Sequence, residues 1–273
     1  MNGCSTELDN GFEVSLSSRD TQTSIMPEHR HGYYELYFLR QGTARNFVEN
    51  DIIPMQHGDF VFIKAGAIHQ AVYEAGCFSE RLLIDFTGEF VGNDYFHVLQ
   101  ELGERKYFPA SGNDQAIKLA AAIHNEYTQP GSMHRELCCA LLQQLLILLY
   151  RQNRHQAIPI LTTSHATMQN AAKYISEHYS EDLSLSILAD MYALSKSHFS
   201  RSFKNATGFG LSKYINLIRV RNAEQLLADG NYPIAEVATK CGFNDSNYFS
   251  AVFKSQTGVS PQKYMAQHQK LKK

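Results

Sequence analysis

The chain has 273 residues, of which 44% are hydrophobic and 19% charged, and its net charge is −2. This length accommodates two ordinary domains, and this composition is typical of a soluble globular protein rather than a disordered chain. The longest apolar run, residues 137–150, is shorter than the roughly 20 residues that span a bilayer, so we expect no membrane partner. Because the N-terminus lacks an export pattern and the five cysteines lack framework spacing, we expect a cytoplasmic protein with reduced thiols.

The charge is distributed unevenly between the two halves of the chain. Residues 1–163 hold 12 Lys and Arg against 19 Asp and Glu, a balance of −7. Residues 164–273 hold 13 against 8, a balance of +5. Only the second half has the sign that attracts a polyanion, but a solvated basic face would have the same balance. The charge alone therefore does not show that the second half binds nucleic acid.

Short strands are expected from about residue 25 to residue 86. Apolar segments alternate there with turn residues, and the clearest segments are YYELYFLR, ARNFVEN, FVFIKAG and RLLIDF. Strands at this density predict an antiparallel sandwich or barrel.

A group of polar residues lies at even spacing within and just before the first of these strands. In an extended strand His29, His31 and Glu35 would lie on one face, followed there by Tyr37. His69, from a later strand, would then complete a four-ligand set suited to a divalent transition metal.

The same residues resemble the first motif of the cupins, a family of small β-barrels. That motif is HxH, three residues, Glu, six residues and Gly, and it is matched in full by His29, His31, Glu35 and Gly42. The second cupin motif is matched only loosely, because Lys64 and Tyr73 occupy the usual proline and asparagine positions beside the matching His69.

Four interpretations of this polar group remain open. It is the catalytic metal site of a cupin dioxygenase or isomerase, a metal site that holds or senses a ligand, the lining of a metal-free effector pocket, or a structural strand. Catalysis needs an open coordination position and a substrate channel, which a sequence does not reveal. We therefore assign no required cofactor, and a divalent metal in the cupin-like domain stays an open alternative.

Helical periodicity replaces the strand pattern from Asp114 onward. Helices are expected over residues 114–127 and 133–152, and the second is apolar nearly all round, so it must be covered on more than one side. We interpret residues 1–112 as a sensing domain, 113–152 as a helical dimerisation segment and 153–165 as a linker.

An internal repeat dominates the C-terminal part. Residues 197–215 align with residues 247–265 at an offset of 50, so that Phe199 matches Phe249 and Phe203 matches Phe253. Residues 185–194 align with 234–243 at an offset of 49. Each copy predicts a helix, a tight turn and a second helix, at about 184–206 and 233–256.

The second helix of each copy has one apolar and one polar face. The phenylalanines are four residues apart and should pack inward, leaving small polar residues outside. Such a face suits a major groove, although a solvated face in a packing repeat is the alternative. The candidate DNA-contacting residues are Ser197, Ser200, Arg201 and Lys204 in the first copy and Ser246, Asn247, Ser250 and Lys254 in the second.

Residues 168–266 resemble the DNA-binding domain of AraC/XylS-type transcription regulators, whose two helix-turn-helix units are joined by a long helix, here residues 211–230. Two departures from the pattern are Ala251 and Met265, each in place of a common arginine. The resemblance implies base and phosphate contacts by the six candidates other than the lysines, and it leaves Arg201 as the bidentate guanine contact. Lys204 and Lys254 are expected to contact phosphates or to lie on the surface.

These observations predict a two-domain fold: an N-terminal all-β cupin-like barrel followed by α-helices, and a C-terminal all-α domain with two helix-turn-helix units at residues 166–267. The expected function is ligand-responsive, sequence-specific transcription regulation without enzymatic activity. The expected partners are a double-stranded DNA operator, a small-molecule effector, a second copy of the chain and, for an activator, RNA polymerase. The alternatives are a cupin metalloenzyme with a helical accessory domain and a helical interaction module with no role in DNA binding.

Overall fold

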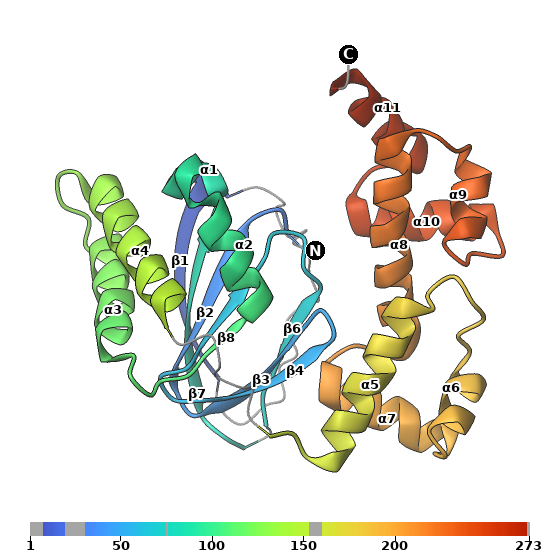
Figure 1. Ribbon diagram of the computed structural model, residues 1–273, viewed down its shortest axis with the longest axis horizontal. Helices are drawn as coiled ribbons and strands as arrows, with labels where there is room; N and C mark the ends of the chain where they lie inside the picture. Colours follow the sequence, from blue (N-terminus) through green and yellow to red (C-terminus); the bar gives the residue numbers. More distant parts are fainter. Residues whose placement is uncertain (1–7, 20–30, 75, 153–159, 272–273) are drawn as a thin grey trace. The chain divides into compact units, whose positions relative to one another are not determined.

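The computed structural model describes residues 8–19, 31–74, 76–152 and 160–271, and the chain divides into two compact units, Met1–Thr162 and Thr163–Lys273 (Figure 1). Among the described residues, no helix is both long enough and apolar enough to cross a membrane. The expected position of His29 lies outside the described residues, as do residues 153–159 of the predicted linker.

The first unit contains two antiparallel sheets. The larger sheet has the order β1-β7-β2-β5-β8 and the smaller β4-β3-β6. The strands are β1 (Phe12–Arg19), β2 (Tyr34–Gln41), β3 (Thr43–Val48), β4 (Asp51–Gln56), β5 (Phe60–Ile63), β6 (His69–Val72), β7 (Ser79–Phe86) and β8 (Tyr107–Phe108). Short helices accompany them, namely η1 (Asp9–Gly11), α1 (Gly88–Val91), η2 (Asn93–Tyr95) and α2 (Phe96–Arg105).

Each face of the larger sheet packs into a different core. Alternate residues of a strand point to opposite faces, so Leu36 and Phe38 of β2 join the core formed with the helices. Tyr37 and Leu39 instead pack with residues of β3, β4 and β5, between the sheets. Glu35 belongs to this second alternating set, which positions a carboxyl group in the protein interior.

Two antiparallel helices, α3 (Asp114–Thr128) and α4 (His134–Arg151), cover the outer face of the larger sheet. They lie side by side in Figure 1. Leu142, Leu145 and Leu146 of α4 are fully buried against the sheet and α3, whereas Leu137 on the other side of α4 is 45% exposed. The helix therefore keeps an uncovered apolar side.

The second unit consists entirely of helices among its described residues, and the long α8 connects its two halves (Figure 1). The helices are α5 (Thr163–Glu177), α6 (Leu185–Met191), α7 (Lys196–Thr207), α8 (Leu211–Asp229), α9 (Ile234–Lys240), α10 (Ser246–Thr257) and α11 (Pro261–Leu271). Residues 163–165, which the sequence suggested as the end of the linker, belong to α5.

The turn and core residues explain why the repeat folds twice into the same unit. Phe199 and Phe203 of α7, like Phe249 and Phe253 of α10, are fully buried. Gly242 has a φ of +81° in the turn between α9 and α10, a conformation that favours glycine. The predicted fold class, a β-rich domain followed by helices and then two helix-turn-helix units, is confirmed.

Candidate functional site

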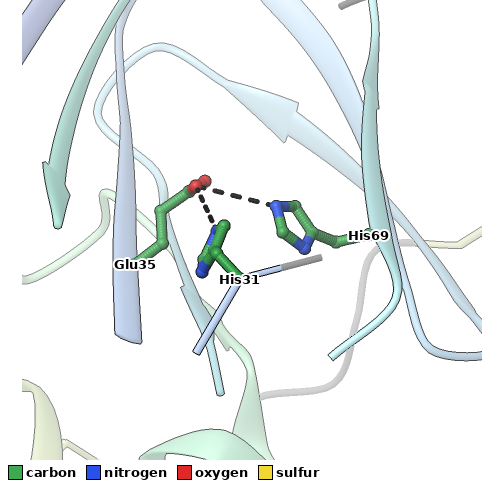
Figure 2. Close-up of side chains that lie close together, drawn as sticks. All are labelled: His31, Glu35 and His69. Carbon is green, nitrogen blue, oxygen red and sulfur yellow. Dashed lines mark hydrogen bonds and ion pairs between the residues drawn. The ribbon is translucent and has the colours of Figure 1, made fainter. Parts of the chain in front are cut away.

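A carboxylate and two histidines meet in the interior of the first unit (Figure 2). Oε2 of Glu35 lies 3.4 Å from Nε2 of His31 and 3.6 Å from Nε2 of His69. All three side chains are buried, and they come from the start of β2, the segment before it and β6 in the facing sheet. We refer to these three residues as the Glu35 centre.

The other ring nitrogen of each histidine is held by the backbone. Nδ1 of His31 lies 2.9 Å from the carbonyl oxygen of Tyr33, and Nδ1 of His69 lies 3.0 Å from that of Ala67. A carbonyl oxygen only accepts hydrogen bonds, so both Nδ1 atoms carry hydrogen. A neutral ring then directs its Nε2 lone pair at the Glu35 carboxylate, which is unfavourable unless a proton or another cation lies between them.

The pKa values follow from this arrangement. Burial opposes ionisation of Glu35, but the hydrogen bond from His31 and the positive charge of both histidines outweigh it and hold its pKa well below the usual value. Burial also opposes protonation of His69, but the negative charge of Glu35, 3.6 Å away, raises the pKa of His69 above the usual value. The Glu35 centre therefore favours an ionised carboxylate with a positive charge beside it.

The donor set also fits a metal cation. The ligand atoms of His31, Glu35 and His69 all lie within 4.8 Å of one another. Two imidazoles and one carboxylate suit a divalent transition metal, and metal-binding histidines usually donate their second N–H to a carbonyl or carboxylate, as both do here.

A small cavity of about 20 Å³, room for a water-sized molecule, adjoins the Glu35 centre. Its lining consists of Glu35, Tyr37, Asn46, His69, Gln70, Ala71, Arg81 and Leu83. Arg81 donates from Nη1 to the Tyr73 hydroxyl at 2.8 Å, and this hydroxyl lies 2.9 Å from that of Tyr37. The interior thus contains an ordered polar network in addition to the centre.

Two buried oxygens, one in the cavity lining and one in the strand beside Glu35, have no hydrogen-bond partner among the described residues. They are Oδ1 of Asn46 and Oδ1 of Asp85, a residue of β7 directly opposite Glu35 in the β2–β7 ladder. Burial and the nearby charge of Glu35 raise the pKa of Asp85 to about 9. Unsatisfied polar atoms of this kind are costly in an apolar interior and mark places where a ligand or water can form a hydrogen bond.

The structure brings His31, Glu35, Tyr37 and His69 together, but not through the expected continuous strand. β2 begins only at Tyr34, and Gly32 and Tyr33 form a bend, so His31 reaches Glu35 across a turn. The strand prediction for His31 is therefore wrong. Sequence reasoning also missed Arg81 and Asp85, although two charged residues four apart within the apolar strand RLLIDF share one face.

The candidate DNA-contacting residues lie on the outer faces of α7 and α10. In α7, Ser197, Arg201 and Lys204 are exposed and Ser200 is partly exposed. In α10, Ser246, Asn247 and Lys254 are exposed and Ser250 is partly exposed. The Ser250 hydroxyl donates to the carbonyl oxygen of Ser246 at 2.9 Å, so only its lone pairs remain for a partner.

Two further exposed side chains on these faces were missed. His198 and Tyr248 occupy equivalent positions near the start of α7 and α10, and both are exposed. The Tyr248 hydroxyl accepts a hydrogen bond of 2.9 Å from Nδ2 of Asn216 on α8. The repeat offset, which aligns His198 with Tyr248, was the signal that could have found them.

The two recognition helices also differ in charge. The exposed residues of α7 include Lys196, Arg201 and Lys204, whereas those of α10 include only Lys254 as a base. Ala251, which aligns with Arg201, is exposed, and Met265 packs partly buried against the second helix-turn-helix core.

Comparison with known proteins decides the family. The model of the AraC-like ligand binding domain matches residues 11–158, more than half of the chain, and a helix-turn-helix model matches residues 188–267. The chain belongs to the AraC family. It is a ligand-responsive, DNA-binding transcription regulator, as the sequence predicted.

Curated relatives of this AraC-family chain match it over nearly their whole length. The HTH-type transcriptional activator RhaS of Salmonella schwarzengrund (strain CVM19633) is 24% identical over 260 residues, covering 91% of this chain and 90% of the relative. RhaS of Citrobacter koseri (strain ATCC BAA-895 / CDC 4225-83 / SGSC4696) is 24% identical over 257 residues, with the same coverage. These relatives are transcription regulators.

Two solved structures are also similar to this chain. ToxT from Vibrio cholerae is 14% identical with a TM-score of 0.39, covering 93% of this chain and 98% of that one. The C-terminal domain of AraT, a response regulator from Geobacillus stearothermophilus, is 32% identical with a TM-score of 0.37, covering 39% of this chain and 88% of that one.

Proposed function

We propose that the effector of this AraC-family regulator binds in the interior of the first unit, at the Glu35 centre and the adjoining cavity. The supporting observation is the concentration of buried polar groups there, including the unsatisfied oxygens of Asn46 and Asp85. A cavity of about 20 Å³ holds little more than a water molecule, so an organic effector must displace lining side chains as it binds. That displacement supplies the difference between the free and bound states on which a sensor depends.

A metal-assisted version of this function has one specific observation in its favour. His31 and His69 are both anchored through Nδ1 and direct Nε2 toward Glu35, so these three residues would hold a divalent transition metal. When bound, the metal would supply positive charge to the effector site. We propose no catalytic turnover, because a sensor needs differential binding and its relatives are regulators.

We propose that α7 and α10 enter successive major grooves of operator DNA. In this arrangement the exposed Arg201 would contact a guanine, and the exposed Lys204 and Lys254 would contact phosphates. The weaker basic character of α10 implies that α7 contributes more of the electrostatic affinity. Ser197, Ser200, Ser246, Asn247 and Ser250 complete the proposed contact set.

We further propose that the regulator acts as a homodimer in the cytoplasm and that, if it is an activator like its named relatives, it contacts RNA polymerase. The exposed apolar side of α4 provides the dimer contact. Two copies would place four helix-turn-helix units on paired half-sites, and the effector would change how the copies hold these sites.

One experiment tests the effector and DNA proposals together. Operator sequences are first selected from random DNA with the full chain, and binding is then measured across a salt titration, with and without candidate effectors and Zn²⁺, Mn²⁺ or Fe²⁺. We expect salt-sensitive, sequence-dependent binding that an effector shifts in the wild type but not in Glu35→Gln. Binding that is insensitive to every compound and metal, or a response that survives intact in Glu35→Gln, would contradict the assigned effector site.

A further inference from the structure

Arg219, near the middle of the connecting helix α8, donates hydrogen bonds to the backbone of the segment that follows α5. Its Nε donates to the carbonyl oxygen of Tyr179 at 2.8 Å, and its Nη2 donates to that of Glu181 at 2.8 Å. Both carbonyls lie just beyond the end of α5 at Glu177, in the segment that leads into the first helix-turn-helix unit. One guanidinium group therefore fixes the position of this segment against α8.

The same guanidinium group contacts the second helix-turn-helix unit. Its Cζ lies 5.7 Å from the centre of the Phe243 ring, and Phe243 is buried in the core of that unit. Phe243 stands in the turn between α9 and the recognition helix α10. Planar guanidinium groups stack favourably on aromatic rings, so Arg219 holds both units at once.

Gly242 shows how closely the three segments meet. A Cβ atom at this position would lie 2.7 Å from the carbonyl oxygen of Tyr179 and 3.0 Å from the Arg219 guanidinium. Contacts this short exclude a side chain. The turn of the second helix-turn-helix unit therefore packs directly on the segment after α5. We name Tyr179, Glu181, Arg219, Gly242 and Phe243 the Arg219 junction.

The junction bears on DNA recognition because α5 and α8 both pack against the first recognition helix, α7. One side of the junction is thus continuous with α7, and the other with the turn that starts α10. Any looseness here would change the separation and relative rotation of the two recognition helices. Duplex DNA repeats every 10–10.5 base pairs over about 34 Å, so one base pair moves the second groove by about 3.4 Å and rotates it by about 34°.

We propose that Arg219 is a positioning residue that sets the operator spacing this regulator accepts, by fixing the second helix-turn-helix unit relative to the first. The proposal rests on the proposed docking of both recognition helices in successive grooves. Arg219 itself need not touch DNA. Its two hydrogen bonds and ring contact join the turn of the second helix-turn-helix unit to the segment after α5, in addition to the packing of α8 against α9 and α10.

The test compares spacing variants of one operator. The full-length chain and its variants are titrated against the selected operator and against a second DNA. The second DNA has one base pair inserted between the sequences that α7 and α10 are proposed to contact. The variants are Arg219→Ala, Arg219→Lys and Gly242→Ala. The control is Lys240→Ala in the same unit, since Lys240 is exposed and makes local contacts with Glu236 at 3.6 Å and with the Tyr232 ring at 4.5 Å.

The readout for each protein is the ratio of its affinities for the two DNAs. A lower folded fraction weakens binding to both DNAs by the same factor, and this factor cancels in the ratio. We expect the insertion to weaken wild-type and Lys240→Ala binding by about tenfold or more, and Arg219→Ala and Gly242→Ala binding by only about threefold. Arg219→Lys should lie between them, since an ammonium group lacks the planar fork that reaches both carbonyls.

Two results would overturn the proposal, and they are distinguishable. An unchanged insertion penalty in both Arg219→Ala and Gly242→Ala would reject the positioning role while leaving two-groove docking intact. A wild-type chain that tolerates the insertion would reject two-groove docking itself, and the role of Arg219 with it.

Discussion

At the level of single residues, the Glu35 centre is the most unusual feature of the first unit, because three ionisable groups share a buried site. The raised pKa of His69 depends on Glu35, so the charge state of each controls the other. This dependence gives a measurable pH effect.

We predict that an NMR titration finds the His69 ring with a pKa above 6.5 in the wild type and at a lower value in Glu35→Gln. A histidine whose folded-state pKa is raised stabilises the protein below its unfolded pKa. This contribution is lost as the pH rises through the folded pKa. The free energy of unfolding of the wild type should therefore fall as the pH rises above 6.5. In Glu35→Gln the contribution of His69 to this fall should disappear. A His69 pKa that Glu35→Gln leaves unchanged would contradict the described geometry.

Arg201 and Lys204 allow base recognition to be separated from phosphate contact on one helix. Arg201→Ala should cost about 1–3 kcal/mol and relax the preference at one or two operator positions. Lys204→Ala should weaken binding to all sequences alike and reduce the slope of log affinity against log salt by about 1. Competition gel shifts with operator and random DNA measure both effects. Equal weakening of operator and random DNA by Arg201→Ala would show that Arg201 does not read a base.

At the level of secondary-structure elements, Asp245 at the start of α10 has two opposite effects. It stabilises the helix as its N-cap, and its negative charge opposes DNA binding. Asp245 caps this recognition helix by accepting a hydrogen bond of 2.6 Å from the Tyr248 backbone N–H. Its negative charge also lies on the part of the helix proposed to approach DNA. The two effects are separable because asparagine caps helices about as well as aspartate.

We predict that Asp245→Ala lowers the free energy of unfolding by about 1 kcal/mol, while Asp245→Asn retains most of the stability. Removing the charge should make Asp245→Asn bind operator DNA about two- to fivefold more tightly at low salt, a gain that fades as salt screens it. Denaturant unfolding and fluorescence anisotropy measure the two effects. Ser195→Ala, which removes the equivalent cap of α7, is the matched control for stability. Destabilisation of the asparagine and alanine variants by the same amount would contradict the capping role.

The elements also show what the sequence could and could not predict. The two helix-turn-helix units were predictable because the C-capping Gly208 and Gly258 and the buried phenylalanines are local signals that occur in both copies. β1 was missed although FEVSLSSR alternates clearly, and β4 was missed because it contains Pro54. A proline is tolerated there because β4 is the edge of its sheet. The contact between Glu35 and His69 joins facing sheets, so only the folded topology, and not residue spacing, determines it.

At the level of the whole molecule, regulation requires the effector site and the DNA-binding face to influence each other. Such coupling is reciprocal, so an effector that strengthens operator binding must itself bind more tightly to the operator-bound protein, by the same factor. The two sites belong to different compact units of the chain. Assembly of two copies is the proposed means by which a change in one unit alters the presentation of the other.

The apolar side of α4 leads to a direct prediction about that assembly. Leu137, Ala140, Leu141, Gln144 and Leu148 recur at helical spacing along it, and all are at least partly exposed. We predict that the wild type sediments as a dimer and that Leu137→Glu shifts it toward monomer by about tenfold or more in dissociation constant, because the glutamate charge would be buried without a partner.

Since Leu137 is already 45% exposed in one chain, Leu137→Glu should unfold at nearly the temperature of the wild type diluted below its dimer dissociation constant, where dimerisation no longer adds stability. The control Gln115→Glu adds the same charge on an exposed position of α3 and should leave the dimer intact. On DNA, Leu137→Glu should lose affinity for paired half-sites while keeping its affinity for a single site, because each DNA-binding unit is unchanged but the second copy is no longer tethered. A monomeric wild type, or a Leu137→Glu chain that still dimerises and binds paired sites normally, would place the contact between copies elsewhere.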